Sequence, residues 1–175
     1  MRWLHPGAER AGPAGTAKPV SKDFAQLKSI LDGIPRSGEV ALCEGLPSEF
    51  WEPRLREREV NQKKTIGLYG DLFYDERLAP QGSDLEQFTK LFSDTRSYQR
   101  YRSTKVCGGY HPDDCFEWKK GDVTTRALSC LECGEVRFFA LRKELYCDLS
   151  PEASRNLARW LSSYQKNRPV AQSQG

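Results

Sequence analysis

The second half of the chain constrains the fold most strongly, because its apolar residues alternate and its turns are short. The pattern covers four segments: 116–118, 123–129, 136–141 and 145–149. Apolar residues at every second position are typical of a strand that buries one face. The turns at 120–122 and 131–134 are long enough to join antiparallel strands but too short for a parallel crossover. We therefore predict an antiparallel meander in this half.

Three other segments have the apolar spacing of amphipathic helices. The first begins after Ser21 and ends at Gly33, and the third begins with Ser150 as its cap. In the second helix, Ser83 and Glu86 have the spacing of a capping box. Helices that pack on one face of an antiparallel sheet make an α+β fold, which is the class that we predict, with about three helices.

The segment between the first two predicted helices is more varied. We predict a brief strand at Val40–Cys43, an ordered loop at Gly45–Pro53 and a strand, turn and strand within Thr65–Tyr74. The strongly charged segment Arg54–Lys64 is predicted as a solvated short helix or a connector. The chain has 175 residues and no internal repeat, which fits one ordinary domain, and we place that domain at residues 21–167.

The two ends differ in composition from the predicted domain. Residues 1–20 are rich in glycine, alanine, proline and charge, and residues 168–175 are similarly poor in large apolar side chains. We therefore expect a disordered leader and a disordered tail. A secretory signal needs an apolar core of about 7–15 residues, and His5 and Pro6 interrupt the start of the chain too early for one. We expect a soluble, cytoplasmic protein, in which thiols stay reduced.

The charge of the chain excludes some partners. Lysine and arginine number 27 and aspartate and glutamate 24, for a net charge of +3, which is too balanced to favour nucleic acid. No run of 18 apolar residues is present, so no membrane-spanning helix is predicted. The basic and tyrosine-rich segment 96–105 is interpreted as a solvated segment rather than a nucleic-acid site. A protein partner remains open.

The cysteines are the unusual feature of the composition, at six against two histidines. Cys130 and Cys133 form a C-x2-C pair followed by a glycine, which is typical of a zinc knuckle between strands. A structural zinc needs four ligands, and Cys107 with His111 is the best second pair. We therefore predict a zinc site at Cys107, His111, Cys130 and Cys133. Two further cysteines are possible substitutes in that set: Cys115 and Cys147.

Other interpretations of the same cysteines are open. They can be buried structural thiols, because cysteine often packs as a small apolar residue. Cys130 and Cys133 can instead form a redox pair or a disulfide, although redox C-x2-C pairs usually begin a helix. A catalytic thiol would need His111 as its base. The function we predict is a non-catalytic binding or accessory domain, and the alternative is a thiol-dependent redox protein or enzyme using Cys130 and Cys133 with His111.

Five segments occur in an order that points to a relative. They are GLPSEFWEP (Gly45–Pro53), CGGYHPDD (Cys107–Asp114), CLECGE (Cys130–Glu135), LYCDLS (Leu145–Ser150) and YQKNRP (Tyr164–Pro169). Together they resemble an uncharacterised family of small bacterial proteins, over roughly residues 40–169. The resemblance implies that Cys107, His111, Cys130, Cys133 and Glu135 occupy matching positions, and it implies no activity.

Overall fold

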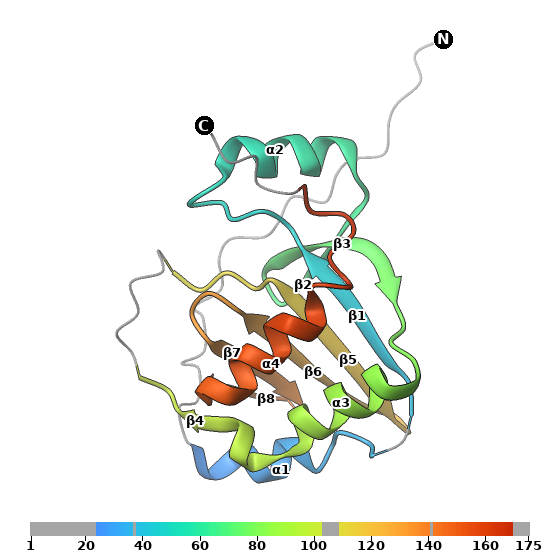
Figure 1. Ribbon diagram of the computed structural model, residues 1–175, viewed down its shortest axis with the longest axis vertical. Helices are drawn as coiled ribbons and strands as arrows, with labels where there is room; N and C mark the ends of the chain where they lie inside the picture. The colour runs from blue at the N-terminus through green and yellow to red at the C-terminus, as the bar shows by residue number, and fades with distance from the viewer. Residues whose placement is uncertain (1–23, 37, 103–108, 141, 170–175) are drawn as a thin grey trace.

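The computed structural model describes residues 24–36, 38–102, 109–140 and 142–169. Within these ranges, eight strands form one sheet in the order β2-β3-β1-β5-β6-β7-β8-β4, and every neighbouring pair is antiparallel (Figure 1). The strands are β1 (Val40–Gly45), β2 (Thr65–Leu68), β3 (Asp71–Leu78), β4 (Tyr98–Arg100), β5 (Asp114–Lys120), β6 (Val123–Cys130), β7 (Glu135–Ala140) and β8 (Lys143–Leu149). The helices are α1 (Leu27–Leu31), α2 (Pro53–Gln62), α3 (Gly82–Ser93) and α4 (Pro151–Leu161), with 3-10 turns at Phe24–Gln26 and Thr95–Ser97. The predicted α+β class and the meander β5–β8 are confirmed.

The main core lies between the sheet and helices α1, α3 and α4, which lie along one face in Figure 1. In the sheet, Phe116 pairs with Ala127, Ala127 with Phe138, and Phe138 with Leu145. Residues directly opposite in an antiparallel pair point to the same face, so these side chains form one continuous apolar row. All four are fully buried, and the apolar faces of the three helices close over them.

The opposite face of the sheet has a smaller apolar cluster. Its buried members are Cys43, Phe73, Cys115, Leu128 and Phe139. Tyr69, in the turn between β2 and β3, stacks on Phe139 of β7 with ring centroids 3.7 Å apart. Since β3 and β7 are separated in the sheet by β1, β5 and β6, this contact requires the sheet to curl. The β2–β3 hairpin thereby covers the second face.

The charged segment 54–64 is helical, as α2, which agrees with the short helix predicted there. Other local predictions differ from the structure. Helix α3 begins at Gly82 with no side-chain cap, so the predicted capping box of Ser83 and Glu86 is wrong. Strand β4 was not predicted, because three residues inside a charged segment give no periodic signal. Its Tyr98 is buried and pairs with Leu149 of β8. The predicted leader, residues 1–20, lies outside the described residues. No described helix is long and apolar enough to cross a membrane.

Candidate functional site

Four segments that are far apart in the sequence meet at one end of the sheet and surround a cavity of about 260 Å³. We call it the four-segment pocket. The segments are the β1–α2 loop, the stretch before β5, the β6–β7 turn and the chain after α4. Its lining residues are Ser48, Trp51, Glu52, Gly109, His111, Asp113, Cys130, Glu132, Cys133 and Arg168. Each of the four segments belongs to a motif that the sequence analysis singled out, so the structure brings those motifs together.

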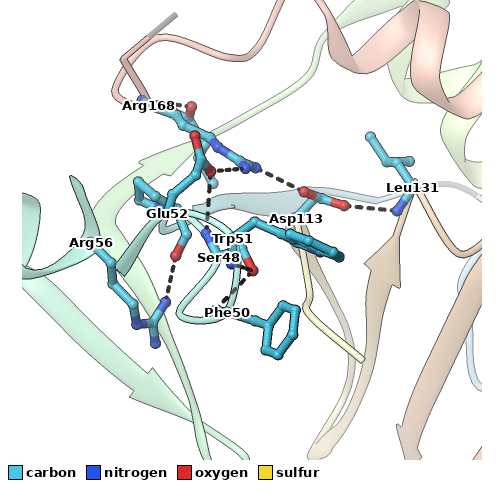
Figure 2. Close-up of polar contacts among 10 residues, drawn as sticks. Ser48, Phe50, Trp51, Glu52, Arg56, Asp113, Leu131 and Arg168 are labelled. Carbon is cyan, nitrogen blue, oxygen red and sulfur yellow. Dashed lines mark hydrogen bonds and ion pairs between the residues drawn. The ribbon is translucent and has the colours of Figure 1, made fainter. Parts of the chain in front are cut away.

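Arg168 links three of the four segments (Figure 2). Its guanidinium donates to Glu52 Oε2 and to Asp113 Oδ1, each at 2.8 Å. Asp113 Oδ2 in turn accepts the backbone N–H of Leu131 at 2.8 Å, which ties the β6–β7 turn into the same network. Burial alone would lower the pKa of Arg168, but the hydrogen bonds and charges of Glu52 and Asp113 raise it above its ordinary value. The guanidinium therefore stays charged and serves as the central brace of the pocket.

Glu44 holds the chain after α4 in place. This residue is 2% exposed, and its carboxylate accepts three consecutive backbone N–H groups, from Lys166 (3.1 Å), Asn167 (2.7 Å) and Arg168 (2.8 Å). A buried carboxylate needs such donors, because an unpaired buried charge is costly. The prediction placed residue 168 at the start of a disordered tail, whereas the structure fixes Arg168 by both its backbone and its side chain.

The β1–α2 loop presents two exposed aromatic rings on a fixed backbone. Ser48 Oγ accepts the N–H groups of Phe50 and Trp51, both at 3.3 Å, and Arg56 donates to the carbonyl of Pro47 at 2.9 Å. Phe50 and Trp51 are 61% and 57% exposed, and their rings form an edge-to-face pair with centroids 4.7 Å apart. Figure 2 shows both rings projecting from the loop. The backbone contacts therefore hold apolar surface in water rather than burying it.

His111 lies against the pocket as a neutral imidazole. Burial lowers its pKa, and the charges of Arg168 and Arg56 act in the same direction, while Asp113 opposes them. The ring hydrogen bonds to the backbone carbonyl of Leu46, and its Nε2 is buried with no hydrogen-bond partner. The bond to Leu46 is therefore made by Nδ1–H, which leaves the lone pair of Nε2 available.

Cys130 is a buried free thiol. Its sulfur accepts the backbone N–H groups of His111 and Cys133, but burial dominates and raises the pKa of the Cys130 thiol to about 11. In a knuckle turn, the backbone N–H of the second cysteine points at the sulfur of the first, as the Cys133 N–H does here. Gly134 continues this turn with a left-handed φ of 63°. Cys133 itself is disulfide-bonded, so its sulfur is not a free thiolate.

Three of the four predicted zinc ligands thus line one pocket: His111, Cys130 and Cys133. The fourth, Cys107, lies outside the described residues. Within the described ranges, no group of three or more His, Cys, Asp or Glu side chains is placed to hold a metal ion. The zinc prediction therefore depends on Cys107 and on a reduced Cys133.

The two substitute cysteines lie elsewhere. Cys147 is in the main core and Cys115 is in the smaller cluster on the opposite face. Burial raises the pKa of both thiols well above the ordinary value. Both are free thiols packed among apolar side chains. This environment fits their interpretation as buried structural thiols.

No role was predicted from the sequence for the residues that organise the pocket, Glu44, Glu52 and Arg168, although Glu52 and Arg168 lie in two of the segments that carry the family resemblance. One signal could have found Glu44, since an acid within the apolar run 40–46 must have a partner if it is buried. Nothing local could have found Arg168, because its partners lie more than 50 positions away. Comparisons of the chain with protein-family models, curated proteins and solved structures found no match.

Proposed function

We propose that this chain is a non-catalytic binding domain and that the four-segment pocket is its ligand site. The observation that carries the proposal is the way the pocket is built. A buried carboxylate and a braced guanidinium fix four distant segments around a cavity, with an exposed aromatic pair beside it. Concave sites with a few convergent polar groups are the usual form of a binding site, and exposed apolar patches on fixed backbone mark interaction surfaces.

The arrangement of the reactive side chains supports binding over catalysis. A thiol nucleophile needs a base whose imidazole is oriented by a third group. Here both oxygens of Asp113 are occupied, by Arg168 and by the Leu131 N–H, and the imidazole of His111 is oriented by a backbone carbonyl instead. The Cys130 thiol, with its pKa raised to about 11 by burial, is almost entirely protonated at neutral pH. These features do not form an activated nucleophile.

Ligand mapping by NMR tests this proposal. The labelled protein is titrated with a library of small amines, carboxylates, sugars and nucleotides. We expect hits to shift the amides of Gly109 and Glu132, which line the pocket, and to stop binding in Glu132→Trp, where an indole blocks an exposed edge. Lys119→Trp, at an exposed position of β5, is the matched control. Hits that bind Glu132→Trp as well as the parent protein, or turnover of a bound compound, would refute the proposal.

A structural zinc at Cys107, His111, Cys130 and Cys133 is part of the same proposal. Two features favour it: the buried lone pair of His111 Nε2 and the two N–H groups directed at Cys130 Sγ, since a zinc-bound thiolate is stabilised by such donors. Zinc binds thiolates, so the ion and the disulfide of Cys133 exclude each other. When bound, zinc would supply only a crosslink between the two cysteine-bearing segments.

Elemental analysis of the reduced protein, combined with a thiol count, tests the zinc site. We expect about one zinc per chain, retained in Cys43→Ser and lost in Cys130→Ser. Cys43 is the matched control because it is a buried free thiol outside the proposed ligand set. Reduced protein that binds no zinc and exposes all six thiols after mild denaturation would exclude the site.

One observation favours thiol–disulfide exchange as a second candidate function. Cys130 is a free thiol and Cys133, three positions later, is disulfide-bonded. In such an exchange, Cys130 loses its proton, its thiolate attacks Cys133 Sγ, and the former partner sulfur leaves as a thiolate that takes the proton. Alkylation rates measured from pH 7 to pH 11 discriminate, because a redox-active Cys130 must react with a pKa near 7. Reaction only above pH 10 would exclude exchange.

A further inference from the structure

We infer that the four-segment pocket receives a lysine side chain of a partner polypeptide, with Phe50 and Trp51 as the apolar rim that holds the stem of that side chain. The inference rests on the proposed function and names the ligand class of the same site. Three properties of the described residues support it: the charge of the lining, the rigid aromatic rim and the size of the cavity.

The charge of the pocket favours a cation. Its lining includes the carboxylates of Glu52, Asp113 and Glu132 and a single guanidinium, that of Arg168. Among the lining residues that the structure describes, Arg168 is the only arginine or lysine, and Glu52 and Asp113 already engage its guanidinium. The third carboxylate, that of Glu132, lies on the exposed β6–β7 turn at the edge of the pocket.

The rim suits the aliphatic stem of a lysine. Lysine buries its methylene groups against apolar surface while its ammonium stays in a polar site. Phe50 and Trp51 provide such a surface, and an indole face also attracts an ammonium. Both rings stand on backbone that Ser48 fixes, so little conformational entropy is lost when a ligand arrives.

The size of the cavity favours a small ligand. Pockets that enclose drug-sized ligands or cofactors have volumes of about 300–1,000 Å³, whereas this cavity measures about 260 Å³. It is therefore suited to one long side chain rather than to a nucleotide. Further apolar area lies on Phe50, which is not among the lining residues, and on the exposed part of Trp51. This area would contact the backbone and neighbouring residues of a peptide. That division favours a lysine within a polypeptide over a free amine.

Titration of the full chain with four probes tests the inference. The probes are three acetylated and amidated pentapeptides, with lysine, glutamine or glutamate between two glycines on each side, and n-butylammonium. We expect the lysine peptide to shift the Trp51 indole signal and to bind at least about 10-fold more tightly than the glutamine peptide and n-butylammonium. The glutamate peptide should not bind. Binding of the lysine peptide should weaken as salt is raised, because the attraction is screened.

Two variants and a control assign the binding to this pocket. Trp51→Ala should weaken binding of the lysine peptide about 10-fold. Glu132→Gln should weaken it about 3-fold, because an exposed charge contributes little. Glu86→Gln, at an exposed position of α3, should have no effect. Equal binding of the lysine and glutamate peptides, n-butylammonium binding as tightly as the lysine peptide, or unchanged binding in Trp51→Ala would overturn the inference. If the pocket binds an acid or a sugar instead, the inference fails and the proposed function stands; if no library compound or peptide shifts a pocket residue, both fail.

Discussion

The main core and the four-segment pocket are held together in different ways. The core consists of apolar side chains on helices and strands, most of them nearly or fully buried. The pocket consists of carboxylates, a guanidinium and backbone N–H groups, with partners up to 124 positions apart. Apolar burial is non-directional and tolerates small adjustments, whereas each bond of the pocket needs a donor and an acceptor in one geometry. The core therefore determines the fold, and the pocket depends on a fold that is already formed.

The difference has an energetic consequence. A buried ion network contributes little net stability, yet removing one partner is costly because the others remain buried and unpaired. Loss of an apolar core residue removes contacts and leaves a cavity. We therefore expect core variants to lower global stability, and pocket variants to disturb the four segments before the rest of the molecule.

The largest loss is expected for Phe116→Ala in the core. Phe116 is fully buried and its ring lies 4.5 Å from Phe92 and 5.2 Å from Phe88, centroid to centroid. Truncation should lower the free energy of unfolding by about 4 kcal/mol, measured by urea denaturation. Phe50→Ala is the matched control. Because Phe50 is exposed, its truncation should lower the free energy of unfolding by less than about 1 kcal/mol. Equal losses in the two variants would contradict the separation of core and pocket.

Gly45→Ala, at the end of β1 that borders the pocket, should lower the free energy of unfolding by about 3 kcal/mol. The Gly45 N–H donates to the Asp113 carbonyl at 2.7 Å, and an added Cβ would overlap the carbonyl oxygens of Pro112 and Asp113. Backbone atoms cannot move aside as a flexible side chain can. Gly67→Ala in β2 is the control, since its Cβ would meet only Leu72 Cδ2 at 3.9 Å. Amide exchange should show the loss concentrated around Gly45; a uniform loss over the core would contradict this prediction.

The same contrast explains what could be predicted from the sequence. The meander was predictable because the alternation in residues 116–149 depends only on neighbouring positions. Helix α4 was predictable because Ser150 caps it, accepting the N–H of Ala153. The order of β1, β3 and β2 was not predictable, because it is determined by pairings such as Leu42 with Leu78, for which the chain offers no local signal.

The site was predictable only in part for the same reason. The C-x2-C spacing identified Cys130 and Cys133, and both line the pocket together with His111. The spacing could not show that Arg168 and Glu52 form an ion pair at 2.8 Å, since 116 positions separate them. A residue that acts through a distant partner leaves no periodic pattern in the sequence. The composition of residues 168–175 therefore led to the prediction of a disordered tail.

Arg168→Met should lower the free energy of unfolding by about 2 kcal/mol. This loss is smaller than for breaking a fully buried ion pair, because the Arg168 side chain is 24% exposed. The variant keeps the length of the side chain but leaves Glu52 and Asp113 without their cation. Arg77→Met is the matched control. It removes an arginine from Glu117 at a side chain that is 44% exposed, and Arg126 still pairs with that carboxylate, so we expect a loss below about 1 kcal/mol.

Amide exchange and a double variant refine the Arg168 prediction. In Arg168→Met, the amide of Leu131 should exchange faster, because Asp113 no longer has the brace that orients it toward that N–H. Adding Glu52→Gln should recover part of the stability by removing an unpaired carboxylate. A larger loss in Arg77→Met than in Arg168→Met would show that the pocket network does not need its brace.

The smallest effect is a pH dependence at Asp114, where the core and the pocket meet. Asp114 is 1% exposed and its Oδ2 has no hydrogen-bond partner. Burial raises its pKa well above the ordinary value, the charges of Asp113 and Glu44 act in the same direction, and Arg168 opposes them. A carboxyl with a raised folded-state pKa stabilises the fold at low pH, and this contribution decreases as pH rises from about 4 toward the folded pKa.

Stability measured from pH 4.5 to pH 5.5 checks this expectation. Over that interval, the parent protein should lose about 1 kcal/mol relative to Asp114→Asn, since one group changes stability by at most about 1.4 kcal/mol per pH unit. Asp122→Asn, at an exposed turn, is the control and should run parallel to the parent protein. If Asp114→Asn also runs parallel, the carboxyl is ionised in the folded state and must be paired by the pocket. Asp114 would then belong to the directional network around Arg168 rather than to the apolar core beneath it.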